Sequence, residues 1–244
     1  MSKGLPQAVE VQFGWDAQRI PVKGHFLLIP AGAFYVGAEE NRRLVAITKP
    51  FYLQETPVTQ AQFLAVTGKS QSHNRGRRQN PVEMVAWVES VDFAKELSQI
   101  TGLHFRLPLS LEWEYAARGG DGDKYLWAGS NEPDDVAWTK HNSGNLTQPV
   151  KQKKPNGYGL YEMSGNVGEW CQDGDQPEYP KQELIDYEIQ SNGAVTTFGA
   201  KGRAIRGGNW QVRSPLARIS SVDNNHYVGA LMDVGFRLVL DVPE

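Results

Sequence analysis

The 244 residues suffice for one large domain or two small ones, and a hydrophobic content of 40% can supply a core. A net charge of −3 gives no electrostatic case for nucleic acid or a membrane surface as partner. No apolar run reaches the roughly 20 residues that span a bilayer, so no membrane insertion is expected. The single cysteine, Cys171, excludes an intrachain disulfide and a cysteine-rich metal site.

The first 24 residues form no helical pattern and lack the basic, apolar start of a secretory signal. We therefore expect a cytoplasmic protein, while a final place on a cell surface or a virion stays open. Residues 9–13 alternate as a strand does. Because no linker or internal repeat follows, we predict an N-terminal extension over residues 1–24 and a single domain over residues 25–244.

Strands come first in the predicted domain, and three short helices follow. Residues 25–37 are predicted to form two strands joined by a Pro-Ala-Gly turn, and residues 45–52 another strand. Thr59 and the glutamine three residues later form a capping-box pattern, which predicts a helix that ends at Gly68. Apolar residues at helical spacing predict a second helix that ends at Gly102, and a third over 111–118.

Residues 69–80, between the first two helices, are polar and basic and include Arg75, Arg77 and Arg78. Such a cluster could contact an acidic ligand, but a solvated, mobile loop is the favoured prediction. After residue 120 helical periodicity disappears. Turns, aromatic residues and short strands are predicted there, including strands within residues 203–210 and 235–240.

Six segments, in order along the chain, resemble the formylglycine-generating enzyme, or sulfatase-modifying factor, family. They are residues 29–34, 51–59, 81–87, 106–120 and 155–171, and the C-terminal pair 205–210 and 235–237. Any one of them would be weak, but together they cover about residues 25 to 240. The resemblance implies a C-type-lectin-like α+β fold with few short helices and strands and much ordered loop.

Two positions depart from the family pattern. Leu109 stands where the family usually has threonine, so the usual cap of the third helix is lost. Ser110 is predicted to replace it by starting the helix one residue later. Gly168 stands where the family usually has tryptophan, which removes a large side chain from the packing there.

The resemblance also implies a structural calcium ion. Its ligands would be the side chains of Glu162 and Glu169 and the backbone carbonyls of Gly165 and Val167. Ca²⁺ takes six to eight oxygen ligands, and a tight glycine-containing turn can direct carbonyls inward. The alternative is that both glutamates pair with arginines. Residues 142–145, where some relatives hold a second calcium, lack carboxylates and are predicted to form a self-capped turn.

Enzymes of this family oxidise a substrate cysteine with two redox cysteines near the C-terminus and with copper bound by thiolates. Residues 209–233 of this chain contain no cysteine, and Cys171 is predicted to be a buried core thiol. We therefore expect no copper and no sulfatase-activating reaction. The five histidines are scattered and show no ligand spacing for an iron site.

The stretch from residue 212 to 231 has an unusual composition. It contains no Lys, Glu, Gln, Met or Trp. Every residue in it can be encoded after random replacement of adenines in an asparagine codon. This resembles the variable proteins of diversity-generating retroelements, whose variable residues lie between an Arg-Gly-Gly-x-Trp block and a Gly-Phe-Arg block. Residues 206–210 and 235–237 are such blocks. The alternative is an ordinary polar loop.

These features favour a non-catalytic protein that binds a macromolecular ligand, with a protein as the expected partner, on a calcium-stabilised scaffold. Polar and aromatic side chains on a rigid fold suit adaptable recognition. The alternative is an oxidase-like enzyme that acts on a peptide or siderophore without the cysteine pair. The predicted contact residues are Asn209, Gln211, Arg213, Arg218, Asp223, Asn224, Asn225, His226, Tyr227, Leu231 and Asp233.

Overall fold

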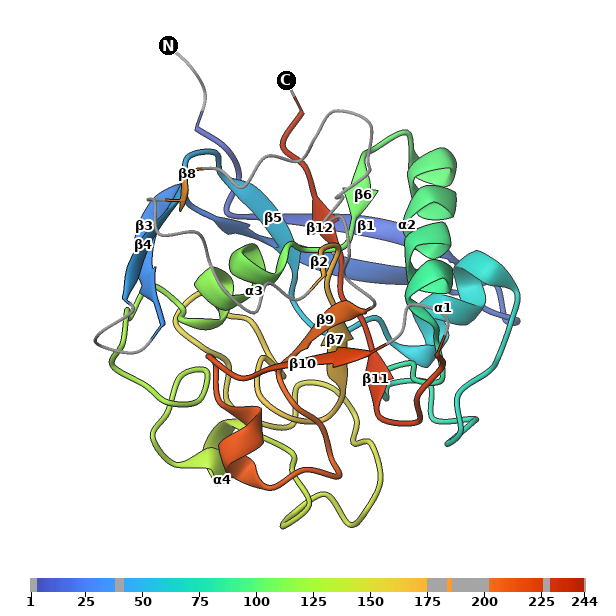
Figure 1. The fold of residues 1–244 in the computed structure, drawn as a ribbon. Helices are drawn as coiled ribbons and strands as arrows, with labels where there is room; N and C mark the ends of the chain where they lie inside the picture. Colours follow the sequence, from blue (N-terminus) through green and yellow to red (C-terminus); the bar gives the residue numbers. More distant parts are fainter. Residues whose placement is uncertain (1–3, 38–41, 175–183, 186–201, 226–228, 244) are drawn as a thin grey trace.

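A five-stranded sheet forms the back of the molecule (Figure 1). The computed structural model describes residues 4–37, 42–174, 184–185, 202–225 and 229–243. Neighbouring strands of the sheet are antiparallel, and their order places a strand from the C-terminal end between two from the N-terminal half. The order is β1 (Ala8–Trp15), β2 (Pro21–Ile29), β5 (Phe51–Gln54), β12 (Val239–Leu240), β6 (Phe105–Arg106).

Two smaller sheets complete the described strands. The first joins β3 (Gly32–Val36), β4 (Arg43–Ile47) and β8 (Leu184–Ile185). The second has the order β10 (Val222–Asn225), β9 (Arg203–Arg206), β7 (Gly168–Trp170), β11 (Val234–Gly235). In the second sheet β7 pairs antiparallel with β9 and parallel with β11. This sheet therefore joins β9 and β11, which lie before and after residues 207–233, to β7.

The predicted strand over 45–52 is divided in the structure. β4 ends at Ile47 and β5 begins at Phe51, and the two strands belong to different sheets. Pro50 stands between them, and proline has no N–H to donate to a strand ladder.

The N-terminal strand β1 pairs with β2, and its Phe13 is fully buried. The centroid of the Phe13 ring lies 6.4 Å from that of Phe26 and 6.2 Å from that of Phe93. The domain boundary at residue 25 stays a prediction.

The first two predicted helices are confirmed. α1 (Gln60–Thr67) has the expected capping box: the Thr59 side chain accepts from the Gln62 N–H at 3.3 Å, and the Gln62 side chain accepts from the Thr59 N–H at 2.9 Å. Gly68 ends it in the left-handed conformation. α2 (Trp87–Thr101) ends at Gly102 in the same way. Two one-turn elements, α4 (Pro133–Val136) and the 3₁₀ turn η2 (Ser214–Ala217), lie farther along the chain.

The start of α3 (Ser110–Ala117) corrects the prediction for Ser110. Ser110 is the first helical residue, not the cap, because its hydroxyl accepts from Arg206 Nε at 2.7 Å. The backbone N–H of Ser110 donates instead to Asp173 Oδ1 at 2.7 Å. Glu112 accepts the N–H of Leu109 at 2.8 Å. A carboxylate from a segment distant in sequence therefore does the work of the lost threonine.

The core consists of two main apolar clusters. One lies between the five-stranded sheet and helices α1 and α2, and the other surrounds α3. Gly168 lies at the edge of the first cluster, where a Cβ would come within 2.7 Å of Ile205 Cγ2 and 3.4 Å of Val234 Cγ2. These two side chains take part of the space that a tryptophan would need. Among the described residues, no helix has the length and apolarity to cross a bilayer.

Candidate functional site, a C-terminal face held by a buried frame

A tight turn at residues 164–167 is hydrogen-bonded to residues 207–210, which directly precede the C-terminal segment, residues 211–233. Gly165 N–H donates to the Gly207 carbonyl and Asn166 N–H to the Trp138 carbonyl, both at 2.8 Å. Trp210 N–H donates to the Asn166 carbonyl at 3.1 Å. Gly165 has a φ of 78°, and a Cβ there would overlap the Trp138 carbonyl, so the turn requires glycine. We call residues 164–170, 205–210 and 235–237 the frame.

A buried ion pair joins the central and C-terminal parts of the frame. Arg237 donates to both carboxylate oxygens of Glu169, each at 2.7 Å, and both side chains are fully buried. Trp113 Nε1 also donates to this carboxylate at 2.7 Å. The remaining guanidinium contacts go to backbone carbonyls, including that of Tyr161 at 2.8 Å. Because the pair is bidentate and its polar atoms are satisfied, it fixes the two segments in one geometry.

Arg206 is the second buried cation of the frame, and it reaches the beginning of β10. Its Nη1 lies 3.1 Å from Glu114 Oε2, and the same nitrogen donates to the carbonyls of Ser220 and Ser221 at 3.4 Å. Together with its bond to the Ser110 hydroxyl, these contacts tie the C-terminal segment to α3.

Glu162, a predicted calcium ligand, is almost fully buried and has an unpartnered oxygen. Its Oε1 accepts from the Lys151 N–H at 2.8 Å, whereas Oε2 has no hydrogen-bond partner. Burial raises the pKa of this carboxyl to about 7, and the charge of nearby Glu169 adds to the effect. Its φ of 53° is unusual for a residue with a side chain. Such strain is typical of positions with a specific task.

The calcium site remains a prediction, and the unpartnered Glu162 Oε2 is the feature that favours it. Of the alternative that both glutamates pair with arginines, only half holds, since Glu169 has such a partner and Glu162 does not. Arg237 already balances the charge of Glu169, and Glu162 Oε2 offers a free acceptor to a hard cation. Among the described side chains, no group of three or more His, Cys, Asp or Glu forms a metal cluster.

Two smaller predictions about this region are confirmed. In the 142–145 turn, Asn142 Oδ1 accepts from the Thr139 N–H at 2.9 Å, and Ser143 Oγ accepts from the Asn145 N–H at 3.2 Å. The turn is therefore self-capped. Cys171 is fully buried beside the frame, and burial raises the pKa of its thiol. The thiolate form that reacts is disfavoured there.

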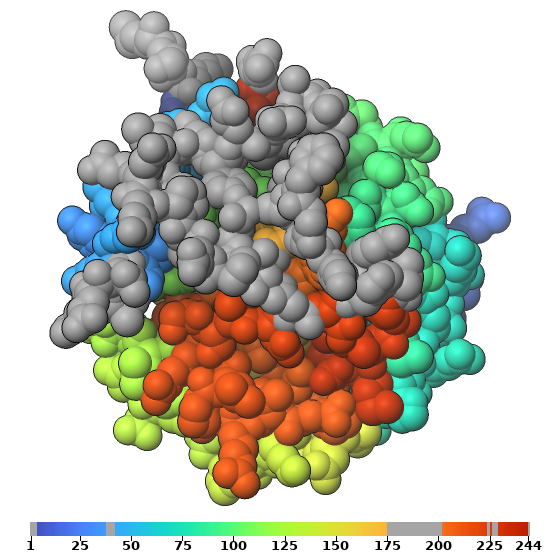
Figure 2. Space-filling view, viewed as in Figure 1, coloured from blue at the N-terminus to red at the C-terminus, as the bar shows by residue number. Residues whose placement is uncertain are grey.

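The predicted contact residues separate into three groups. Exposed or half-buried side chains on η2, β10 and the loops beside them are Gln211, Arg213, Arg218, Asp223 and Asn225; we call this set the C-terminal face. It lies at the centre of the orange and red surface in Figure 2. Asn209, Leu231 and Asp233 lie at its base. The side chain of Asn224, and His226 and Tyr227, fall outside the described part of the chain.

The residues at the base contact the rest of the molecule. Asn209 is buried, donates to Asp233 Oδ2 at 2.8 Å and accepts from the Gln211 N–H at 2.9 Å. Burial raises the pKa of Asp233. The Leu231 carbonyl accepts from the Met84 N–H at 2.9 Å. Asn209 thus closes the loop internally, in a role that its place beside residues 212–231 did not reveal.

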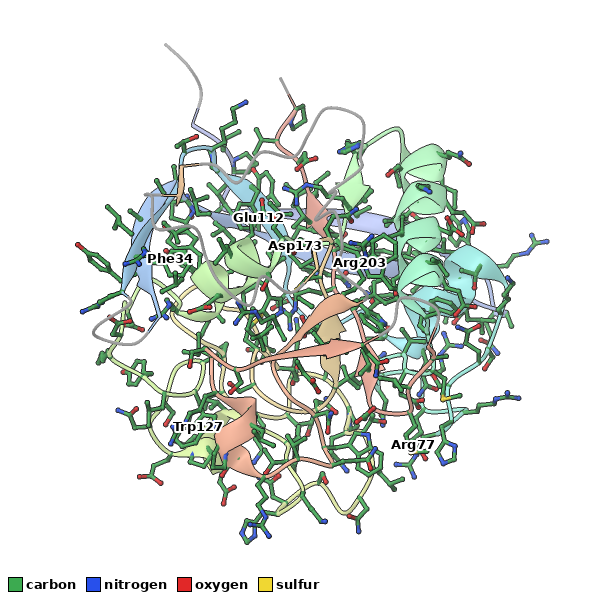
Figure 3. The ribbon with its side chains drawn as sticks, viewed as in Figure 1. Phe34, Arg77, Glu112, Trp127, Asp173 and Arg203 are labelled. Atoms are coloured by element: carbon green, nitrogen blue, oxygen red, sulfur yellow. The ribbon has the colours of Figure 1, made fainter. Side chains whose placement is uncertain are left out.

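Sequence reasoning missed several apolar side chains on the same surface. Leu216 is 60% exposed, Val222 44% and Met232 41%. In the sequence, each is an apolar residue in a polar segment whose apolar residues do not follow the spacing of a buried helix or strand. It also missed Trp127, which donates to the Ser214 carbonyl at 2.8 Å and lies under the Arg218 guanidinium at 5.6 Å (Figure 3). This tryptophan supports η2 from below.

An open hollow of about 700 Å³ lies elsewhere, between β1 and the ends of α1 and α2. Trp15, Ile100 and Leu103 are among its lining residues. None of the predicted contact or metal residues lines it.

Comparison with known proteins identifies similar sequences and structures. The family model described as "sulfatase-modifying factor enzyme 1-like domain" matches residues 16–242. "Chaperone protein LppX" of Paenibacillus barcinonensis is 28% identical, over 89% of this chain and 90% of that protein. The formylglycine-generating enzyme of Streptomyces coelicolor is 31% identical over 68% of this chain, which spans 54% of that enzyme's length.

Among solved structures, Treponema denticola variable protein 1 is similar over 98% of this chain and 100% of its own. The TM-score is 0.85 and the sequence identity 26%. The predicted C-type-lectin-like α+β fold, with few short helices and much ordered loop, is confirmed.

Proposed function

The chain belongs to the family of sulfatase-modifying factor enzyme 1-like domains, and from this premise we propose that it is a non-catalytic protein that binds a macromolecular ligand. The ligand is a protein, and the C-terminal face contacts it. The frame holds this face in place without supplying contacts of its own.

One observation carries this proposal. Between residues 206 and 237 the two ends are buried and hydrogen-bonded, while several side chains between them are exposed. Arg206 and Arg237 are buried and fully engaged at the two ends. Between them Gln211, Arg213 and Arg218 are exposed. An interface needs side chains that meet a partner while their backbone stays fixed, because ordering a loose segment opposes binding.

The variable form of the proposal draws support from composition. The stretch without Lys, Glu, Gln, Met or Trp, residues 212–231, contains most of the C-terminal face. The structural similarity to a protein named as variable in Treponema denticola points the same way. We infer that the segment is diversified as in the variable proteins of diversity-generating retroelements.

Sequencing the locus in sibling strains tests this proposal. Differences should concentrate within about residues 209–233 and spare the frame outside them, and a reverse transcriptase gene with a near-copy of the segment should lie nearby. Differences spread evenly over the chain, with no such gene, would refute the diversified version. Binding by a fixed face would then have to be judged on a partner.

Calcium would stabilise the scaffold. Glu162, Glu169 and the carbonyls of Gly165 and Val167 would hold the ion, which would balance the charge of Glu162 when that carboxyl is ionised. In the same turn the Asn166 carbonyl accepts the Trp210 N–H. An ion bound here would therefore make the base of the C-terminal face more rigid.

The enzymatic alternative is an oxidase-like activity on a peptide or siderophore. The likeness to formylglycine-generating enzymes favours it. The burial of Cys171 and the absence of any cysteine from residues 209–233 count against it. Dioxygen uptake with a cysteine-containing peptide and added copper separates the two functions. Uptake that requires Arg218 would establish an enzyme, and none is expected from a binding protein.

A further inference from the structure

The loop at residues 71–78 is hydrogen-bonded to the domain, although its sequence favoured a solvated, mobile loop. The fully buried Glu83 carboxylate accepts from the backbone N–H of His73 at 2.8 Å and of Asn74 at 3.1 Å. The Glu83 N–H in turn donates to Ser72 Oγ at 3.3 Å. A buried carboxylate with backbone donors on both oxygens fixes the first half of the loop.

Gln60, the first residue of α1, holds the second half. Its Nε2 donates to the Asn74 carbonyl at 3.0 Å, and its Oε1 accepts from the Arg77 N–H at 3.2 Å. At the entrance to the loop, Gln71 donates to the Met84 carbonyl at 3.1 Å. Bonds to two separate elements give the 71–78 loop a defined backbone.

This loop is linked through Met84 to Leu231, at the base of the C-terminal face. The Met84 N–H, just after Glu83, donates to the Leu231 carbonyl at 2.9 Å, and Leu231 packs against the same apolar cluster as Val82. In Figure 1 the teal loop lies beside the red segment that contains β11, and Figure 3 labels Arg77 at that edge. Teal and red surfaces also adjoin in Figure 2.

Two cations of the loop face solvent. Arg75 and Arg77 are exposed, and in the described part of the chain neither guanidinium has an ion-pair partner. Arg75 Nε donates only to the nearby Ser72 carbonyl at 3.2 Å. Arg78 differs, because it pairs with Asp16 at 2.9 Å. Two uncompensated arginines at one place stand out in a chain whose net charge is −3.

We propose that the 71–78 loop is a constant flank of the recognition surface, on which Arg75 and Arg77 bind aspartate or glutamate side chains of the protein partner. This rests on the proposed function. A guanidinium matches a carboxylate in bidentate geometry, and a backbone already fixed loses less entropy on binding. Because the loop lies outside residues 212–231, it keeps this acidic preference whatever the variable segment becomes.

The test uses the full chain, immobilised, and a random 12-residue peptide library displayed on phage. Selection is repeated with Arg75→Gln/Arg77→Gln and with the charge-matched control Lys49→Gln/Lys95→Gln, whose two lysines are exposed on other elements. A fourth chain carries Gln211→Ala, Arg213→Ala and Asp223→Ala on the C-terminal face. Melting temperatures confirm that all four chains are folded.

Peptides selected by the natural chain should be rich in Asp and Glu. Arg75→Gln/Arg77→Gln should weaken their binding about tenfold, as expected for losing charge-assisted hydrogen bonds, and the lysine control should bind as the natural chain does. Equal binding by the two double variants, or selected peptides with no acidic bias, would overturn the inference alone.

Binding that survives the substitutions on the C-terminal face would instead overturn the proposed function, as would failure to select any peptide. A single-stranded DNA probe of 20 nucleotides represents the other class of acidic ligand, nucleic acid. Tighter Arg75- and Arg77-dependent binding to this DNA than to the acidic peptides would assign the flank to nucleic acid and refute a protein partner.

Discussion

The frame and the C-terminal face contain the same kind of side chain in opposite situations. Arg237, in the frame, is fully buried and donates to a carboxylate and to backbone carbonyls. Arg218, on the face, is exposed, and its guanidinium lies 5.6 Å from the centre of the Trp127 ring. The contacts that stabilise the domain are therefore made by buried residues of the frame, and the exposed side chains of the face take little part in them. Side chains of the face can change without unfolding the domain.

The largest expected effect comes from Arg237→Met. It removes the cation from a buried bidentate pair and leaves Glu169 charged and uncompensated. We expect the free energy of unfolding to fall by about 3–5 kcal/mol, measured by urea denaturation. Arg218→Met is the matched control and should change it by under about 0.5 kcal/mol. A loss under about 1 kcal/mol for Arg237→Met would erase the contrast between the two regions.

Removal of calcium should give the next largest effect. If calcium saturates the site at a hundred times its dissociation constant, EDTA lowers stability by about 2.7 kcal/mol, a drop of several degrees in Tm. Glu162→Gln should remove the response to EDTA. Glu169→Ala is unsuitable here, because it also strips Arg237 of its partner. An EDTA response of the same size in the Glu162→Gln variant, or none in the natural chain, would exclude this site.

A pH effect should sharpen the comparison, because a buried carboxyl beside the frame has a shifted pKa. Burial raises the pKa of Asp173 from its usual 3.8 to about 6. The folded protein thus keeps a proton that the unfolded chain has lost, so this contribution is fully present below about pH 4 and is lost as the pH rises to about 6.

Asp173→Asn stays neutral and retains an acceptor for the Ser110 N–H. Relative to the natural chain, the variant should gain about 1–3 kcal/mol of stability between about pH 4 and pH 8. Unfolding curves at four pH values measure this difference. A difference that stays constant with pH would mean that Asp173 ionises normally in the folded protein.

The smallest effects are expected on the face itself. Gln211→Ala, Arg213→Ala and Asp223→Ala should each change the free energy of unfolding by less than about 0.5 kcal/mol. Asn209→Ala provides the contrast within the same segment, because Asn209 closes the base of the loop through Asp233. It should cost about 1–2 kcal/mol. Equal costs at Asn209 and Gln211 would show that the boundary between frame and face is misplaced.

Features with a local cause could be predicted from the sequence. The capping box of α1 needs only Thr59 and Gln62, three residues apart, and the helix ends at a glycine that adopts the left-handed conformation. The order of six family segments gave the fold class, which the structural similarity confirms. The self-capped turn at 142–145 is likewise local.

Features made by residues far apart in sequence were missed. Asp173 caps α3 across 63 positions, a pairing that no local pattern announces. Glu83 fixes the 71–78 loop from beyond its end, so polar composition alone suggested mobility. Asn209 is a residue type suited to binding, but its side chain donates to Asp233 and serves the interior of the domain. Composition identified the segment, and only tertiary structure separated its surface from its base.

The place of β12 has a consequence for how the protein is made. This strand follows the C-terminal face in the chain, yet it lies between β5 and β6, pairing Val239 with both Leu53 and Arg106. The main sheet cannot close until synthesis has passed through the whole face. A chain cut short within residues 211–233 therefore lacks an inner strand of the main sheet and cannot complete it.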